Sequence, residues 1–232
     1  MPRKSLYRKK KGRSKVPRAL NLRKRKLPVL GMPSKQVVRL RYCEEITLDP
    51  ASGAFDVKHF SANGMWDPNI AIGGHQPLYF DQYMANYDHY TVIGSKIRVT
   101  PMASDNAYNT TALPGVYGVF LDDDTTFSYT NLAQIIESNQ NKHHYRSYNN
   151  SLTGANTKGM NPTITRKFSA KKFFQNAIAD SNKGTALSNP SDGAFYSIWA
   201  HAVDGNNPTK TTFMVEIEYI ALLTEPKFIA QS

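Results

Sequence analysis

The sequence predicts an all-β fold: a single eight-stranded jelly-roll β-sandwich, preceded by a disordered basic N-terminal arm and carrying one or two short helices in its loops. Three observations support this class. Beyond residue 35, apolar and polar side chains alternate along several separate runs, as half-buried strands require. Stretches rich in Gly, Pro, Asn and Asp separate these runs, and only two segments have a helical pattern. A chain of 232 residues is long enough for one β domain of this kind.

The first and last runs show the alternation most clearly. In the run 36–48, the predicted inward side chains are Val38, Leu40, Tyr42, Ile46 and Leu48, and the predicted outward ones are Arg39, Arg41, Glu45 and Thr47. In the run 211–223, the predicted inward side chains are Phe213, Val215, Ile217, Tyr219, Ala221 and Leu223. Apolar residues also occur on the second face of this last run, so we expect it to be covered on both sides towards its end.

Six further runs complete the predicted eight strands: 54–60, 89–100, 115–121, 144–148, 163–169 and 194–203. Turn-forming sequences separate them at 49–53, 73–74, 113–115, 189–193 and 204–208. The helical segments are 79–87 and 130–139, the latter with Thr130 or Asn131 as its N-cap. Eight strands with long corner loops favour a jelly roll over an immunoglobulin-like domain, which would be shorter and more evenly spaced.

Charge divides the chain into two unlike parts. Residues 1–41 hold 16 of the 29 Lys and Arg residues, and the first acid is Glu44. Residues 42–232 contain the other 13 basic residues and all 18 acids, so their formal charge is −5. We therefore predict a basic arm over residues 1–35 and a jelly-roll domain over residues 36–232. Because its like charges repel and its prolines block regular pairing, the arm is expected to be disordered until it meets an anion.

Nucleic acid is the partner that this arm fits best. An amphipathic membrane helix needs an apolar stripe, which the arm has only in poor form. Binding of phosphates needs only dense positive charge, because it is driven by counterion release and reads no sequence. The predicted phosphate-binding residues are Arg3, Lys4, Arg8, Lys9, Lys10, Lys11, Arg13, Lys15, Arg18, Arg23, Lys24, Arg25, Lys26, Lys35, Arg39 and Arg41. The cluster Arg23, Lys24, Arg25 and Lys26 also fits a nuclear-import signal, with a host import receptor as partner.

The sequence offers little for catalysis, metal or membrane. It has no P-loop, G-x-S-x-G or H-E-x-x-H pattern, so we expect no enzyme and no cofactor. The one Cys, Cys43, allows no intramolecular disulfide. Asp122, Asp123 and Asp124 are the only, weak, metal candidates, because a calcium loop needs spaced ligands and a central Gly; a polar turn is favoured, with a weak interfacial Ca²⁺ site left open. No apolar run approaches the roughly 18–20 residues of a membrane helix, so membrane insertion is not expected.

Three stretches resemble capsid proteins of circular, Rep-encoding single-stranded DNA viruses, the circovirus-like group. Residues 76–99 have a Pro-containing turn, a short helix and a tyrosine-rich passage into a V-x-G-S-K pattern at Val92, Gly94, Ser95 and Lys96. Residues 167–175, KFSAKKFFQ, are similar to a basic-aromatic segment of that family, although Gln175 stands where Gly is frequent, so the local turn is expected to differ. The third is the ending, YSIWA at 196–200 followed by the run 215–226.

This resemblance implies a coat protein. Sixty copies would close an icosahedral shell around a circular single-stranded DNA genome, in virions assembled in the host nucleus. Sixty arms would then supply about 960 positive charges, the same order as the phosphates of a small genome. Arg39 and Arg41 would extend the inner lining beyond the arm. A host cell-surface receptor is also implied, but the sequence does not identify it.

Two other classes of function remain open at this point. A nucleic-acid-binding regulator, viral or not, also joins a basic arm to a folded domain, but it needs a site-reading helix, zinc site or exposed aromatic sheet. A carbohydrate-binding jelly roll explains the domain and leaves the arm unexplained.

Overall fold

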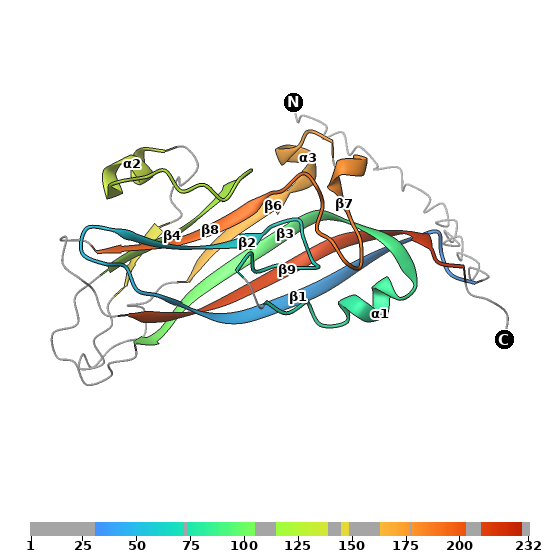
Figure 1. Ribbon diagram of the computed structural model, residues 1–232, viewed down its shortest axis with the longest axis horizontal. Helices are drawn as coiled ribbons and strands as arrows, with labels where there is room; N and C mark the ends of the chain where they lie inside the picture. The colour runs from blue at the N-terminus through green and yellow to red at the C-terminus, as the bar shows by residue number, and fades with distance from the viewer. Residues whose placement is uncertain are drawn as a thin grey trace, which may run out of the picture. The chain divides into compact units, whose positions relative to one another are not determined.

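The alternating runs of the sequence form two antiparallel sheets that pack face to face (Figure 1). The structure is a computed structural model, which describes residues 31–71, 74–104, 115–138, 145–148, 163–176, 178–202 and 210–228. In spatial order, the first sheet holds β1 (Lys35–Leu48), β9 (Thr211–Pro226), β3 (Tyr87–Ser104) and β6 (Ile164–Ser169), and the short β7 (Lys183–Gly184) also pairs with β3. The second sheet holds β2 (Phe55–Ser61), β8 (Phe195–Ala202), β4 (Gly115–Asp122) and β5 (Tyr145–Tyr148).

The strand order is that of a jelly roll. β1 pairs with the last strand, β9, in an unbroken register from Lys35↔Thr224 to Leu48↔Thr211. The next strand, β2, crosses to the second sheet, β3 returns to the first, and β4 lies in the second again. The predicted eight-stranded jelly roll is thereby confirmed, and each of the eight predicted runs forms a strand. The sequence did not predict β7, which has only two residues and no alternation to detect.

The core between the sheets is built from the predicted inward faces. All five predicted inward side chains of β1 and all six of β9 are buried. Tyrosines fill much of this core, and their hydroxyl groups hold the loop that follows β2. Tyr219 Oη donates to the carbonyl of Ser61 at 2.7 Å, and Tyr90 Oη accepts from the Met65 amide at 3.0 Å. Because a buried hydroxyl without a partner is costly, these bonds fix the loop as well as satisfy the tyrosines.

A second apolar cluster covers the outer face of the second sheet. Trp199 of β8 and Phe120 of β4 point outward there, and both are fully buried. They are covered by residues 123–138, from which Phe127 and the helical Ile135 pack onto them. The close approach is permitted by Gly118 of β4, where an added Cβ would lie 2.4 Å from the indole ring of Trp199.

The helices are shorter than predicted. α1 spans Phe80–Met84 within the predicted 79–87, because the chain enters β3 at Tyr87, which is fully buried. α2 spans Leu132–Glu137 within the predicted 130–139. Its N-cap is Asn131, one of the two predicted residues, whose side chain accepts from the Gln134 amide at 3.0 Å. The structure also has α3 (Ala170–Phe173) and a 3₁₀ turn at Asp180–Asn182, neither of which was predicted.

Two further expectations concern the last strand and the turn after α3. The second face of β9 is covered only in part, since Ile220 and Leu222 are half-buried. Gln175, which follows α3, has φ 62°, the left-handed conformation that glycine adopts most easily. The chain therefore makes this turn without a glycine.

None of the described helices is long and apolar enough to cross a membrane.

Candidate nucleic-acid interface

Three of the predicted phosphate-binding residues lie in the described part of the chain. Lys35, Arg39 and Arg41 are exposed on β1 and alternate with buried apolar side chains, so they lie on the outer face of the first sheet. The other predicted residues, between positions 3 and 26, lie outside the described residues. The predicted nuclear-import signal at 23–26 is among them. Contacts group Pro33–Ser232 into one unit, and β1 is its first strand.

Strand pairing brings more cations beside these arginines. Glu218 of β9 is opposite Arg41 on one side and opposite Lys96 of β3 on the other. Lys96 is in turn opposite Lys167 of β6. One row across the sheet therefore reads Arg41, Glu218, Lys96, Lys167. With strands about 4.8 Å apart, this row is about 14 Å wide.

Each of the two neighbouring rows adds one further arginine. Arg98 of β3 is opposite Glu216 of β9, and Arg39 lies one row away on β1. Across these three rows the outer face carries five cations and two carboxylates, which leaves three positive charges without an acid in the same rows. The basic residues are Arg39, Arg41, Lys96, Arg98 and Lys167, and the acids are Glu216 and Glu218. We call this set the basic face.

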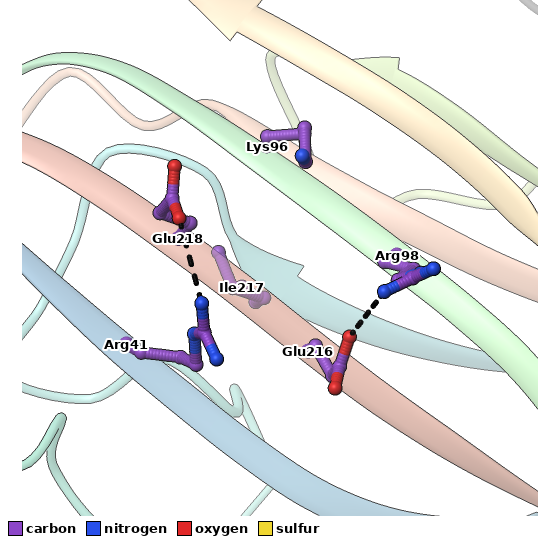
Figure 2. Close-up of a pocket in the computed structure, with 6 residues that line it drawn as sticks. All are labelled: Arg41, Lys96, Arg98, Glu216, Ile217 and Glu218. Carbon is purple, nitrogen blue, oxygen red and sulfur yellow. Dashed lines mark hydrogen bonds and ion pairs between the residues drawn. The ribbon is translucent and has the colours of Figure 1, made fainter.

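The two glutamates hold the arginines in loose ion pairs (Figure 2). Glu218 is 3.7 Å from Arg39 Nε and 3.7 Å from Arg41 Nη2, through different oxygens. Glu216 is 3.4 Å from Arg98 Nη1. The three arginine side chains remain 68%, 70% and 56% exposed. These ion pairs border a small hollow of about 100 Å³, which Lys96 also lines (Figure 2). Among the described residues, Lys96 has no ion pair.

Such an arrangement is suited to binding phosphate. Exposed ion pairs contribute only about 0.2–1 kcal/mol, so a phosphate group can replace a carboxylate at little cost. Guanidinium groups offer planar, bidentate donors to phosphate oxygens, and the lysines add point charges. The glutamates fix the arginines on the sheet and cancel only part of their charge. The basic face therefore offers an open, anion-attracting surface on a rigid support.

Sequence reasoning missed the cations that do not lie on β1. The signal for two of them is present in residues 94–100, where Lys96 and Arg98 alternate with buried Ile97 and Val99 as the arginines of β1 do. Their proximity to Arg41 depends on β9 lying between β1 and β3, which the sequence pattern does not reveal.

Lys167 has a basic neighbour that faces the other way. Arg166 alternates with it along β6 and is half-buried on the inner side, where burial lowers the pKa of its guanidinium. Within the basic-aromatic segment itself, Lys167 is on the basic face and Phe168 is buried in the core.

The three aspartates considered for metal binding form a polar turn at the end of β4. Asp122 Oδ1 accepts from the Asp123 amide at 2.9 Å, and Asp124 Oδ1 accepts from the Thr126 amide at 2.7 Å. Burial, with lesser contributions from its acidic neighbours, raises the pKa of the Asp122 carboxyl. Among the described residues, no three His, Cys, Asp or Glu side chains are placed to hold a metal ion together.

Comparison with known proteins finds similarity only among solved structures. No family model matches the chain, and no curated protein matches it. The Macrobrachium rosenbergii nodavirus structure aligns with a TM-score of 0.46 at 10% identity, over 100% of this chain and 63% of that one. The decameric BFDV capsid protein aligns at 0.42 and 8% identity, over 82% and 99%. Desmodium yellow mottle tymovirus aligns at 0.42 and 15% identity, over 88% and 95%. At these identities and TM-scores, such similarities assign neither a family nor a function.

Proposed function

We propose that this protein is a viral coat protein that assembles into a small icosahedral shell and packages circular single-stranded DNA. The arm, residues 1–35, would bind the genome, and the jelly-roll domain would form the wall. Residues 23–26 would serve nuclear import before assembly in the host nucleus. Sixty copies, a DNA genome, an import receptor and an unidentified cell-surface receptor would be its partners.

The basic face is the observation that carries this proposal. β1 begins at Lys35, the last residue of the predicted arm, and runs along the basic face through Arg39 and Arg41. β1 thus places two of the predicted phosphate-binding residues, Arg39 and Arg41, beside cations of β3 and β6. Residues 42–232 are acidic overall, so attraction for a genome is restricted to the arm and this face. A shell with this face inward would line its interior with phosphate-binding groups.

Contacts between copies need apolar surface elsewhere on the domain. Leu187 is 79% exposed in the turn after β7, and Ile178 is 56% exposed before it. Phe228, just beyond β9, is 95% exposed. Exposed apolar side chains of this size can be covered when copies of a chain associate. These residues are separate from the basic face and are available for contacts along the wall.

The competing functions explain less of the molecule. A regulator that reads a DNA sequence needs an element for the major groove or a zinc site, and the longest described helix, α2, has six residues. A carbohydrate-binding jelly roll gives no reason for the arm or the basic face.

Analytical ultracentrifugation with absorbance at 260 and 280 nm tests the proposal. The full-length protein should sediment as one large closed species rich in 260 nm absorbance. A variant without residues 1–32, which leaves β1 intact, should form empty shells or free subunits. A full-length variant with Gln at positions 23–26 keeps the chain length and controls for loss of the arm itself. If every form stays small and full-length protein merely carries nucleic acid, the shell is excluded and a regulator is favoured.

A further inference from the structure

A groove of about 470 Å³ lies along the free edge of β1. Its walls come from β1 and from the segment that leads into α1, and include Arg39, Arg41, His75, Gln76, Leu78 and Tyr79. No described strand pairs with this edge of β1. The groove is mainly apolar inside, with two guanidinium groups on one wall. Its size and composition are in the range of sites that hold a small organic group.

Tyr79 is fixed in an exposed position at this groove. Its side chain is 61% exposed and that of Leu78 is 70% exposed, whereas the next residue, Phe80, is buried. The backbone of Tyr79 has φ 71°, an unusual conformation for tyrosine. The turn is closed by the Phe80 amide, which donates to the carbonyl of Pro77 at 3.0 Å, and by the Tyr83 amide, which donates to the carbonyl of Tyr79 at 3.2 Å. The aromatic ring is therefore presented by a rigid turn.

The groove is continuous with the basic face. Arg41 borders both the groove and the hollow that also contains Lys96 and Arg98. A nucleic-acid strand whose phosphates follow the basic face thus reaches the groove with a phosphate still beside Arg41. The next group along such a strand is a base. Two exposed aromatic rings border the groove, and the His75 ring is already stacked on Tyr42, with ring centroids 4.5 Å apart, which leaves Tyr79 free to receive the base.

We propose that this groove is a stacking site for a base of single-stranded nucleic acid. Tyr79 would stack on the base, Leu78 would cover part of it, and Arg39 and Arg41 would bind the adjoining phosphate. Single-strand-binding proteins combine a cationic track with aromatic side chains in this way, and stacking tolerates any base. A duplex keeps its base faces covered, so the site selects single strands. This inference rests on the proposed function and names the form of nucleic acid that the domain itself would recognise.

Binding of two oligomers of equal length by the full-length protein tests this site. One is oligothymidylate and the other is its abasic counterpart, which has the phosphates without the bases. The arm contacts phosphates in both, so the ratio of the two affinities reports the contribution of the bases. Tyr79→Leu should lower this ratio about tenfold, and Tyr79→Phe should restore most of it. Leu keeps the same backbone restriction as Tyr. Trp66→Leu, which removes an exposed aromatic ring that does not border the groove, should leave the ratio unchanged.

The outcomes separate this site from the wider proposal. If wild-type protein binds both oligomers and Tyr79→Leu leaves the ratio unchanged, the stacking site is wrong while packaging by charge stands. If Tyr79→Leu leaves the ratio unchanged and prevents large particles from forming, the groove is a contact between copies of the chain and the stacking site is again wrong. If wild-type protein binds neither oligomer, both proposals fail. Unchanged thermal unfolding of Tyr79→Leu verifies that the variant is folded.

Discussion

The inner faces of the two sheets are similar in composition, whereas their outer faces differ in composition and burial. Both inner faces contribute tyrosine, phenylalanine and aliphatic side chains to one core. The outer face of the second sheet is apolar and buried under residues 123–138, with Trp199 at its centre. The outer face of the first sheet is charged and open, with Arg39 and Arg41 more than two-thirds exposed. One face is used for stability and the other is left available for a ligand.

The burial patterns of the individual strands account for this difference. β1 alternates between buried and exposed residues along almost its whole length. In β8 every residue after the first is buried, and in β4 the first six are. A strand that is covered on both sides needs apolar side chains at consecutive positions, whereas a strand with one open side needs them at every second position. Cations on the outer faces of β4 and β8 would therefore carry a burial cost that those of β1 do not.

The largest effect is expected on the covered face. Trp199→Ala should lower the free energy of unfolding by about 3–5 kcal/mol, because it empties the centre of the second cluster. Arg41→Ala, on the open face, should change it by less than about 0.5 kcal/mol. Urea unfolding of both variants, at one protein concentration, measures the difference. Equal losses would show that the two faces are not energetically distinct.

The next effect concerns the open face and nucleic acid. Replacing Arg41, Lys96 and Arg98 together by Gln should lower the slope of log affinity against log salt by about 2, since each phosphate contact on a single strand contributes roughly 0.7. The measurement is a salt titration of binding to oligothymidylate. Exchanging Lys and Arg at the same three positions preserves charge and should preserve the slope. A slope that does not change in the Gln variant would mean that only the arm meets the phosphates.

Folding stability should depend on pH through a histidine on the covered face. His59 of β2 lies beneath residues 123–138, its Nδ1 is 2.9 Å from Ser197 Oγ, and burial lowers its pKa, with Asp124 opposing this in part. The folded protein therefore favours neutral His59, and the unfolded chain takes up more protons as the pH falls below about 6.5. Stability should fall between about pH 6.5 and the lower folded pKa. His59→Gln should reduce this loss, as measured by unfolding at pH 7 and pH 5; an identical loss in the variant would place its cause elsewhere.

The smallest effect is expected at the end of α3, after the edge strand β6. Gln175 is exposed and its φ of 62° costs a non-glycine residue about 1–2 kcal/mol. Gln175→Gly removes this cost but adds flexibility to the unfolded chain, so a net gain of up to about 1 kcal/mol is expected. Gln175→Val should be destabilising instead. A shift in melting temperature for each variant gives the sign, and a loss with Gly would contradict this account of the turn.

The sequence predicted most of the strands because their signal is local. Alternation along residues 36–48 and 211–223 identified both the strands and their buried faces. The position before a helical run limited the N-cap to Thr130 or Asn131, and the structure has Asn131. The short β7 and α3 have too few residues to show a period. α1 ends earlier than predicted because the burial of Tyr87 in β3 stabilises the chain more than another turn of helix would.

What the sequence determined by itself is the division of charge, the class of fold and the inward sides of β1 and β9, because these depend on composition and on residues close together in the chain. Only the tertiary structure decided which outer face is open and which cations meet. Arg41, Lys96 and Lys167 are far apart in sequence and come together because β9, the last strand, inserts between β1 and β3. The groove beside Tyr79 has the same origin: an edge of β1 and a turn about forty residues later are brought together by the packing of the whole domain.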